Sequence, residues 1–161
     1  MEYRRLGNSG LEVSVVGLGT NNFGGRMDAK QTDDVIKKAI DEGINMIDTS
    51  NSYGRTLSEE YIGKSVKDVR DQVLLATKVA SPMSDGPNMR GTSRKHIVDQ
   101  AEQSLKRQDN DYLDLYQIHF PDQRTPIEET LRTLDDLVHQ GKVRYIGCSN
   151  FASWLVAQAM E

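Results

Sequence analysis

Short apolar runs that are typical of buried strands alternate with segments of helical periodicity along almost the whole chain. No other feature of the sequence constrains the fold as strongly, because such an order is characteristic of proteins in which helices cover a parallel sheet. Five strands are expected, at intervals of about 30 to 40 residues, and they are Val13–Val16, Ile44–Ile47, Val73–Ala76, Leu113–Ile118 and Val143–Cys148.

Capping side chains predict where the helices between these strands begin. The expected starts are Thr32 to Asp34, the pair Thr56 and Glu59, Thr92 or Ser93, and the segment Thr125 to Glu128, with a further helix after Ser149. The start at Thr125 has the strongest signal, because it combines a capping box with a proline, Pro126, at the first helical position. Glycines at 43 and 141 are expected to end two of the helices.

The repeated strand–helix order predicts a parallel sheet with right-handed crossovers. Two architectures fit this order, a doubly wound open sheet and a (β/α)₈ barrel of about 250 residues that is cut short, and periodicity alone does not choose between them. Residues 1–161 are expected to form a single α/β domain, since no low-complexity linker divides them. The segment Ser81–Gly91, rich in proline, glycine and methionine, is expected to be an enlarged loop.

Charge and composition argue against several classes of partner. The formal net charge of −4 comes from interleaved acidic and basic residues, and no run of lysine and arginine suits a nucleic acid or an anionic membrane. The N-terminus lacks the apolar stretch of a secretory signal, and no segment approaches the roughly 18 apolar residues of a membrane span. We therefore expect a cytoplasmic protein. Its single cysteine, Cys148, is expected to be a buried strand residue and excludes an internal disulfide.

Polar side chains follow four consecutive predicted strands. Asp48, Lys78, His119 and the pair Ser149–Asn150 each stand where a strand ends. In a parallel barrel the carboxyl ends of the strands meet at one face, where the active sites of this fold are built, so these residues are expected to converge. Each taken alone is more often a cap or a solvated residue, but the coincidence over four strands favours function. His96 and His139 lie among polar helical residues and are expected at the surface.

These residue types suit proton transfer to a carbonyl oxygen. Asp48 and Lys78 are expected to form an ion pair, and a cation beside a tyrosine favours the ionised form of the phenol. Tyr53, five residues after Asp48, is the available phenol. It would donate its proton to the oxygen while His119 orients the carbonyl. No side chain delivers hydride, so such a cluster needs a nicotinamide beside it.

Five motifs, in family order along nearly the whole chain, resemble those of the aldo-keto reductases. They are Gly17–Thr20, Ile47–Gly54, Ala76–Lys78, Asp111–His119 and Gly147–Phe151. Together they are far more specific than the first motif alone, which fits a Rossmann fingerprint poorly because the third glycine is missing.

The resemblance implies a (β/α)₈ barrel that reduces aldehydes or ketones with NADPH. It implies that Tyr53 is the general acid, that Lys78 and Asp48 tune its acidity and that His119 orients the carbonyl. The residues that it places at the cofactor are Gly19, Thr20, Asn21, Asp48, Ser149 and Asn150, and it implies no metal.

The sequence departs from the family in two ways. Family members are roughly twice as long, and the strands that would follow Glu161 hold the residues that bind the adenosine 2′-phosphate and close the barrel, so the chain is expected to be an inactive N-terminal part. In addition, Arg107–Asn110 stands where the family usually places a leucine before Asp111, which predicts the loss of an apolar contact worth roughly 1.5–3 kcal/mol.

Three other functions remain open. The first is a non-catalytic half-barrel that binds a partner or a second copy through its open sheet edges. The second is an aldolase in which Lys78 forms a Schiff base, although Tyr53 with His119 favours a reductase. The third is a metal hydrolase using Asp48 and His119, which lacks a further His or Glu at ligand spacing.

Overall fold

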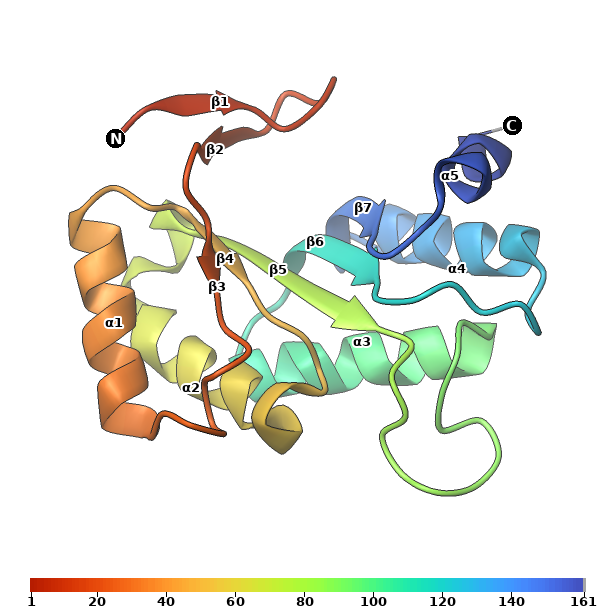
Figure 1. Ribbon diagram of the computed structural model, residues 1–161, viewed down its shortest axis with the longest axis horizontal. Coiled ribbons are helices and arrows are strands. Elements are labelled where there is room, and N and C mark those ends of the chain that lie inside the picture. The colour runs from red at the N-terminus through yellow and green to blue at the C-terminus, as the bar shows by residue number, and fades with distance from the viewer. Residues whose placement is uncertain (161) are drawn as a thin grey trace.

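The computed structural model describes residues 1–160 and contains a five-stranded parallel sheet in the strand order β3-β4-β5-β6-β7 (Figure 1). The strands are β3 (Leu18–Gly19), β4 (Met46–Asp48), β5 (Leu74–Val79), β6 (Leu113–Ile118) and β7 (Val143–Cys148). The α/β class with parallel strands alternating with helices is therefore confirmed. Because each strand pairs with the next one along the chain, the order has no reversal of the kind that defines a doubly wound sheet.

The helices follow the strands in sequence and form part of a ring around the sheet. They are α1 (Ala29–Asp41), α2 (Leu57–Val66), α3 (Arg94–Gln108), α4 (Ile127–His139) and α5 (Ser153–Met160), with short 3₁₀ segments at η1 (Tyr53–Thr56) and η2 (Lys67–Gln72). Each of the first three packs against the next, α1 on α2, α2 on α3 and α3 on α4 (Figure 1). This succession is the geometry of an incomplete barrel wall.

The first strand of the parallel sheet is not the one that the sequence predicts. The apolar run at Val13–Val16 contributes instead to β2 (Glu12–Ser14), which pairs antiparallel with β1 (Tyr3–Arg5) in a separate hairpin (Figure 1). Leu18 and Gly19 take the place beside β4, in register with Ile47 and Asp48. The side chain of Asn45 fixes this arrangement, since its Oδ1 accepts from the backbone of Ser14 at 2.8 Å.

The predicted starts of α2 and α4 are correct in position but lack the predicted side-chain caps, and the predicted start of α1 lies too late in the sequence. Helix α1 begins earlier, where Asp28 and Gln31 form a capping box. Thr56 has a positive φ of 81° and caps nothing. Thr125 donates its hydroxyl to Asp122 at 2.9 Å, so α4 starts without a side-chain cap. The predicted start at Ser93 is confirmed, because its hydroxyl accepts from the backbone of His96.

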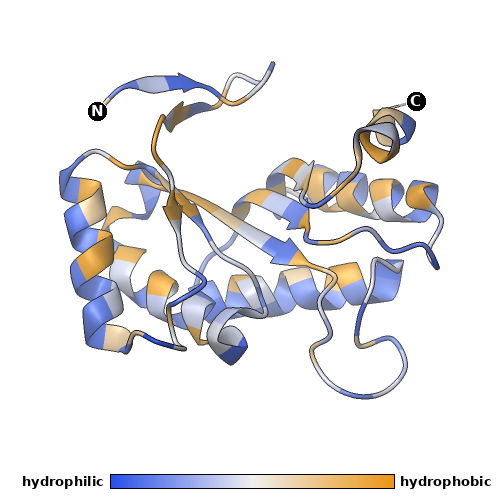
Figure 2. Cartoon of the chain, viewed as in Figure 1, coloured by the Kyte–Doolittle hydropathy of each residue, from blue (hydrophilic) through white to orange (hydrophobic). Residues whose placement is uncertain are grey.

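Two clusters of buried apolar residues hold the helices on the sheet, and apolar residues are prominent on β3 and on the first part of β5 in Figure 2. The cluster around β4 and β5 includes Ile36, Ile47, Ile62, Val66 and Leu75. The cluster around β6 and β7 includes Ile97, Leu105, Leu113, Tyr116, Leu134, Leu137 and Val143. Burial of these side chains is the main stabilising contribution that the sequence pattern predicts.

A buried polar cluster stands where the sequence predicts a lost apolar contact. The carboxylate of Glu59, fully buried on α2, accepts from Thr77 Oγ1 at 2.5 Å, from Gln108 Nε2 at 3.1 Å and from Arg107 Nε at 2.6 Å. Gln108 is itself buried. Charge-assisted hydrogen bonds therefore join α2, β5 and α3 at this point, in place of apolar packing.

Two further expectations are wrong because of tertiary context. His96 is buried, since the segment that leads from β5 to α3 covers it, and its Nδ1 lies 3.1 Å from the carbonyl oxygen of Asn88. Burial lowers the pKa of His96 below the usual value. Cys148 is exposed, because β7 is the last strand of the described sheet and only one of its edges is paired. His139 is exposed, as expected.

We expect the substitution Gly63→Ala to destabilise the fold by about 2–3 kcal/mol, although glycine-to-alanine changes within helices usually stabilise. An added Cβ would lie 2.5 Å from the carbonyl oxygen of Gln108 and 2.6 Å from its Cα, so α2 and α3 would have to separate. Urea denaturation measures the effect. Gly10→Ala is the control, because a Cβ there meets nothing within 4 Å. Equal stability of both variants would contradict the close approach.

Candidate active site

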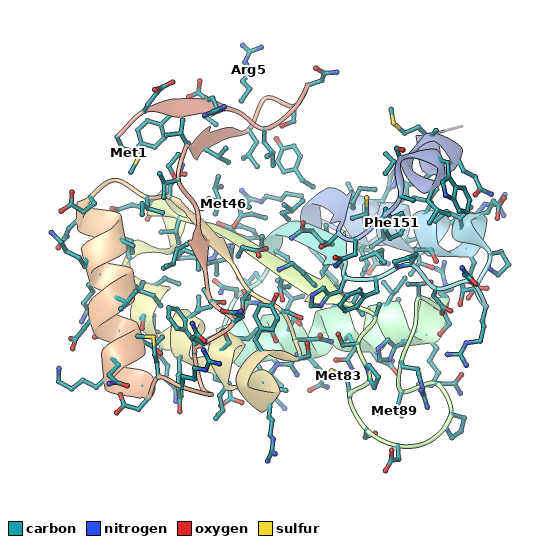
Figure 3. All side chains as sticks on the ribbon, viewed as in Figure 1. Met1, Arg5, Met46, Met83, Met89 and Phe151 are labelled. Atoms are coloured by element: carbon teal, nitrogen blue, oxygen red, sulfur yellow. The ribbon has the colours of Figure 1, made fainter. Side chains whose placement is uncertain are left out.

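The carboxyl ends of the parallel strands bring the predicted polar residues to one end of the sheet. The enlarged loop between β5 and α3, marked by Met83 and Met89 in Figure 3, extends from this same end. Asp48 ends β4, Lys78 is the second-to-last residue of β5, and His119 and Ser149 follow β6 and β7 directly. The convergence that the sequence predicts is thus present in the structure.

Asp48 and Lys78 form an ion pair across two neighbouring strands. Lys78 Nζ lies 2.6 Å from Asp48 Oδ2 and donates a second hydrogen bond to the carbonyl oxygen of Thr49 at 2.7 Å. The lysine side chain is only 6% exposed and the aspartate 37%, so the cation is held among protein atoms while the carboxylate remains accessible. Asp48 and the carbonyl oxygen of Thr49 therefore hold the Lys78 ammonium in a fixed position.

Tyr53 lies beside this pair at the start of η1. Its ring centroid is 5.2 Å from Lys78 Nζ and 5.8 Å from the ring centroid of His119. The turn after it is tight: Gly54 has a φ of 57°, and a Cβ there would lie 2.3 Å from the carbonyl oxygen of Phe23. Arg55 also adopts a positive φ, a conformation that is costly outside glycine and that often marks functional loops.

His119 faces two hydroxyl groups and an aromatic ring. Its Nδ1 lies 3.3 Å from Ser50 Oγ and 3.4 Å from Ser81 Oγ, and the ring of Phe120 stacks on it at 4.3 Å. Burial, and then the charge of Lys78, lower the pKa of His119. The imidazole is therefore neutral near pH 7. A hydroxyl that donates to Nδ1 leaves the ring proton on Nε2, available as a donor.

The residues predicted at the cofactor differ in how open they are. Gly19 and Asn21 are exposed, and a Cβ at Gly19 would meet nothing within 4 Å. Thr20 is buried and its hydroxyl donates to the backbone oxygen of Asp48 at 3.0 Å, so this side chain fixes the strand ends. Asn150 Nδ2 donates to the backbone oxygen of His119 at 2.8 Å and lies 3.0 Å from Ser149 Oγ.

Three side chains that contact this cluster escape prediction from the sequence. Ser50 and Ser81 contact His119, and Gln117 Nε2 donates to Asp48 Oδ1 at 3.1 Å. Gln117 carries a sequence signal, because it is a polar residue two positions before His119, and alternate strand residues share a face. Ser50 and Ser81 carry no such sequence signal, since serine is common in loops.

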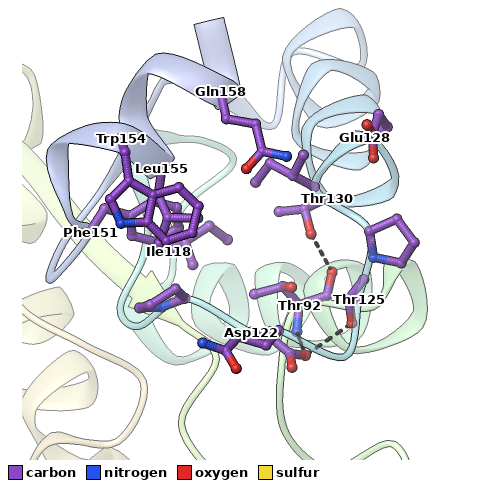
Figure 4. A pocket seen from close by; sticks show the side chains of 14 residues that line it. Thr92, Ile118, Asp122, Thr125, Glu128, Thr130, Phe151, Trp154, Leu155 and Gln158 are labelled. Carbon is purple, nitrogen blue, oxygen red and sulfur yellow. Dashed lines mark hydrogen bonds between the residues drawn. The ribbon is translucent and has the colours of Figure 1, made fainter.

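A separate pocket of about 330 Å³ lies between α5 and the segment that follows β6 (Figure 4). Phe151 and Trp154 line one side, and Asp122 lies opposite. Asp122 accepts from the backbone of Thr92 at 3.0 Å and from Thr125, and so ties the loop before α3 to the loop before α4. The pocket is distinct from the Tyr53 cluster, whose residues do not line it.

Comparison with known proteins assigns the family. The sequence model described as the aldo/keto reductase family matches residues 15–161. The chain belongs to the aldo/keto reductase family. Aldo-keto reductase YhdN of Bacillus subtilis is 46% identical over 158 residues, which cover 94% of this chain and 48% of the relative. A probable voltage-gated potassium channel subunit beta of Arabidopsis thaliana is 36% identical, over 99% of this chain and 49% of its own.

A solved structure confirms the architecture that the resemblance implies. The crystal structure of a thermostable aldo-keto reductase, in complex with the inhibitor epalrestat, matches with a TM-score of 0.89 and 38% identity, over 99% of this chain and 58% of its own. The fold is thus part of the barrel of this family. The chain spans about half the length of the curated relatives it matches.

Residues 1–160 contain neither a membrane-spanning helix nor a cluster of metal ligands. No helix there is both long and apolar enough to cross a membrane. No group of three or more His, Cys, Asp or Glu side chains is placed to hold a metal ion.

We expect the imidazole of His119 to titrate with a pKa below about 6.5, because burial and Lys78 disfavour its charged form. As the pH falls through that value the unfolded chain binds the proton first, so the free energy of unfolding decreases there. Lys78→Met should raise the pKa of His119, whereas Lys30→Met, on exposed α1, should not change it. NMR titration of the ring measures both. A midpoint at or above 6.5 in the unsubstituted chain would contradict the buried environment.

Proposed function

We propose that this site, in a complete barrel, reduces aldehydes or ketones to alcohols with NADPH, in the cytoplasm. A complete barrel here means the chain joined to the remaining βα units, as a longer gene product or as a chimera with those of YhdN. The observation that carries the proposal is the Lys78–Asp48 pair, whose lysine is buried, beside the ring of Tyr53, with the ring of His119 also close to that ring.

Each of these side chains has a distinct task in the proposal. Tyr53 Oη donates its proton to the carbonyl oxygen as negative charge develops there, and Lys78 stabilises the phenolate that remains. Asp48 holds Lys78 in place through their ion pair. Neutral His119 donates a hydrogen bond from Nε2 that orients the carbonyl. Because Asp48, Lys78 and His119 lie on strand ends or directly after them, the sheet holds the geometry of these three residues, while Tyr53 is held at the start of η1.

The exposed strand ends fit the nicotinamide end of the cofactor. The Ser149 hydroxyl and the Asn150 amide offer the donor and acceptor that a carboxamide needs, and the open space at Gly19 leaves room for a flat ring above β3. When bound, NADPH supplies the hydride that no side chain provides. In the resembled family, the contacts to the phosphate and the adenine come from strands that would follow residue 161.

A second candidate is a non-catalytic half-barrel that associates through its open edge. The observation that favours it is the exposure of β7, where Ile146 is 42% exposed and Cys148 is exposed as well. An apolar edge strand with unpaired backbone groups invites pairing with a second copy. Size-exclusion chromatography with light scattering over a range of concentrations separates the two, since a concentration-dependent dimer favours association.

We expect Tyr53→Phe in a complete barrel to abolish carbonyl reduction while the affinity for NADPH stays nearly the same. The phenol acts on charge that develops in the transition state, so its loss lowers kcat and leaves ground-state binding intact. Steady-state kinetics and a fluorescence titration measure the two effects. Tyr3→Phe, in the N-terminal hairpin, is the matched control. Unchanged turnover in Tyr53→Phe would remove Tyr53 as the proton donor.

We expect the isolated 161-residue chain to bind NADPH weakly or not at all and to show no measurable reductase activity. Five strands do not close a barrel, so the face of the sheet that would line the barrel interior is open to water. Water there weakens the electrostatic interaction between Lys78 and Tyr53. Phosphate contacts are usually strong and charge-assisted, and in the family they lie on other strands. Fluorescence titration of the purified chain tests this. A micromolar dissociation constant for a folded monomer would show that the remaining strands are dispensable.

A further inference from the structure

Gln117 contacts the centre of the proposed site, although none of the tasks above falls to it. Its Nε2 donates to Asp48 Oδ1 at 3.1 Å, while Lys78 Nζ donates to the other oxygen, Oδ2, at 2.6 Å. The two oxygens of one carboxylate are thus held by two donors from two different strands. A carboxylate fixed at both oxygens has lost the freedom to rotate about its last torsion, which is otherwise a soft coordinate.

The register of the sheet explains why Gln117 can do this. Gln117 on β6 lies directly opposite Lys78 on β5, so their side chains leave the sheet on the same face. The amide then reaches over β5 to Asp48 on β4, and the contact spans three strands. On the other side, β7 places Gly147 opposite Gln117, and an added Cβ would lie in ordinary van der Waals contact, 3.4 Å from Gln117 Cγ.

The chemistry of the amide suits a neutral support. A second cation at this place would compete with Lys78 for the carboxylate, and an apolar side chain would leave Oδ1 to water, because Asp48 is 37% exposed. The amide donates without adding charge. We propose that Gln117 is a positioning residue: it fixes the Asp48 carboxylate, which fixes the Lys78 ammonium beside the ring of Tyr53. The effect on catalysis rests on the proposed function, whereas the contact itself does not.

Proton exchange in the 161-residue chain tests the contact without any assay of activity. In the unsubstituted chain we expect the side-chain amide of Gln117 to exchange with water about tenfold more slowly than that of Gln103, an exposed residue on α3. This comparison needs no variant, so it does not depend on whether a substituted chain folds. Equal exchange rates for the two amides would overturn the proposal.

A substitution then tests whether the amide positions Lys78. In Gln117→Met, which keeps the length of the side chain, we expect the Lys78 ammonium protons to exchange about tenfold faster, since the carboxylate that holds them is free to rotate. Gln103→Met is the matched control and should leave Lys78 unchanged. A merely structural role would lower stability in urea and leave exchange at Lys78 as it was, and this result would overturn the proposal.

Kinetics in a complete barrel measure the consequence for the reaction. Gln117→Met should lower kcat about tenfold and leave KM for the carbonyl within about twofold, and it should have no further effect in a Lys78→Met background, because both substitutions act through one pair. An active unsubstituted barrel whose kcat is insensitive to Gln117→Met would overturn the inference alone. An inactive unsubstituted barrel would instead overturn the proposed function, and the exchange measurements would then decide the role of Gln117.

Discussion

Parallel pairing of consecutive strands is the constraint on which the site depends. Because β4, β5 and β6 run in the same direction and in sequence, their carboxyl ends lie side by side, and residues 48, 78 and 119 become neighbours although about 70 positions separate the first from the last. No local interaction could bring them together. The buried apolar clusters that hold the helices against the sheet therefore also hold the geometry of the site.

Polar groups inside this fold are satisfied in groups that span several elements. Lys78 donates hydrogen bonds to Asp48 and to the carbonyl oxygen of Thr49. Glu59 accepts hydrogen bonds from Thr77 and Arg107. The two clusters are linked through the backbone of β5, because residues 77 and 78 are consecutive and point to opposite faces of the strand. One face of β5 thus carries the polar contact that docks α2 and α3, and the other carries the cation of the site.

Periodicity and strand-end chemistry predict much of this structure, and their failures share one physical cause. The runs Leu113–Ile118 and Val143–Cys148 match β6 and β7, and the pairing of Asp48 with Lys78 follows from strand ends alone. The choice between a barrel and a doubly wound sheet needed the family resemblance. What fails depends on partners distant in the sequence. Glu59 has the residue type and position of a helix-capping residue in the sequence. It is nevertheless buried, because Arg107 and Thr77 donate hydrogen bonds to its carboxylate in the interior.

The exposure of single residues is hard to predict from the sequence, because it depends on elements that are distant in the sequence. His96 belongs to a polar stretch, and only the arrangement of the covering loop, through the carbonyl of Asn88, places it inside. Cys148 ends an apolar run of the kind that usually forms a buried strand. It is exposed because β7 lies at the edge of the described sheet. Sequence patterns report which face of an element is apolar. Whether that face is covered depends on the neighbouring elements, and for β7 the neighbour on one side would be a further strand of a closed barrel.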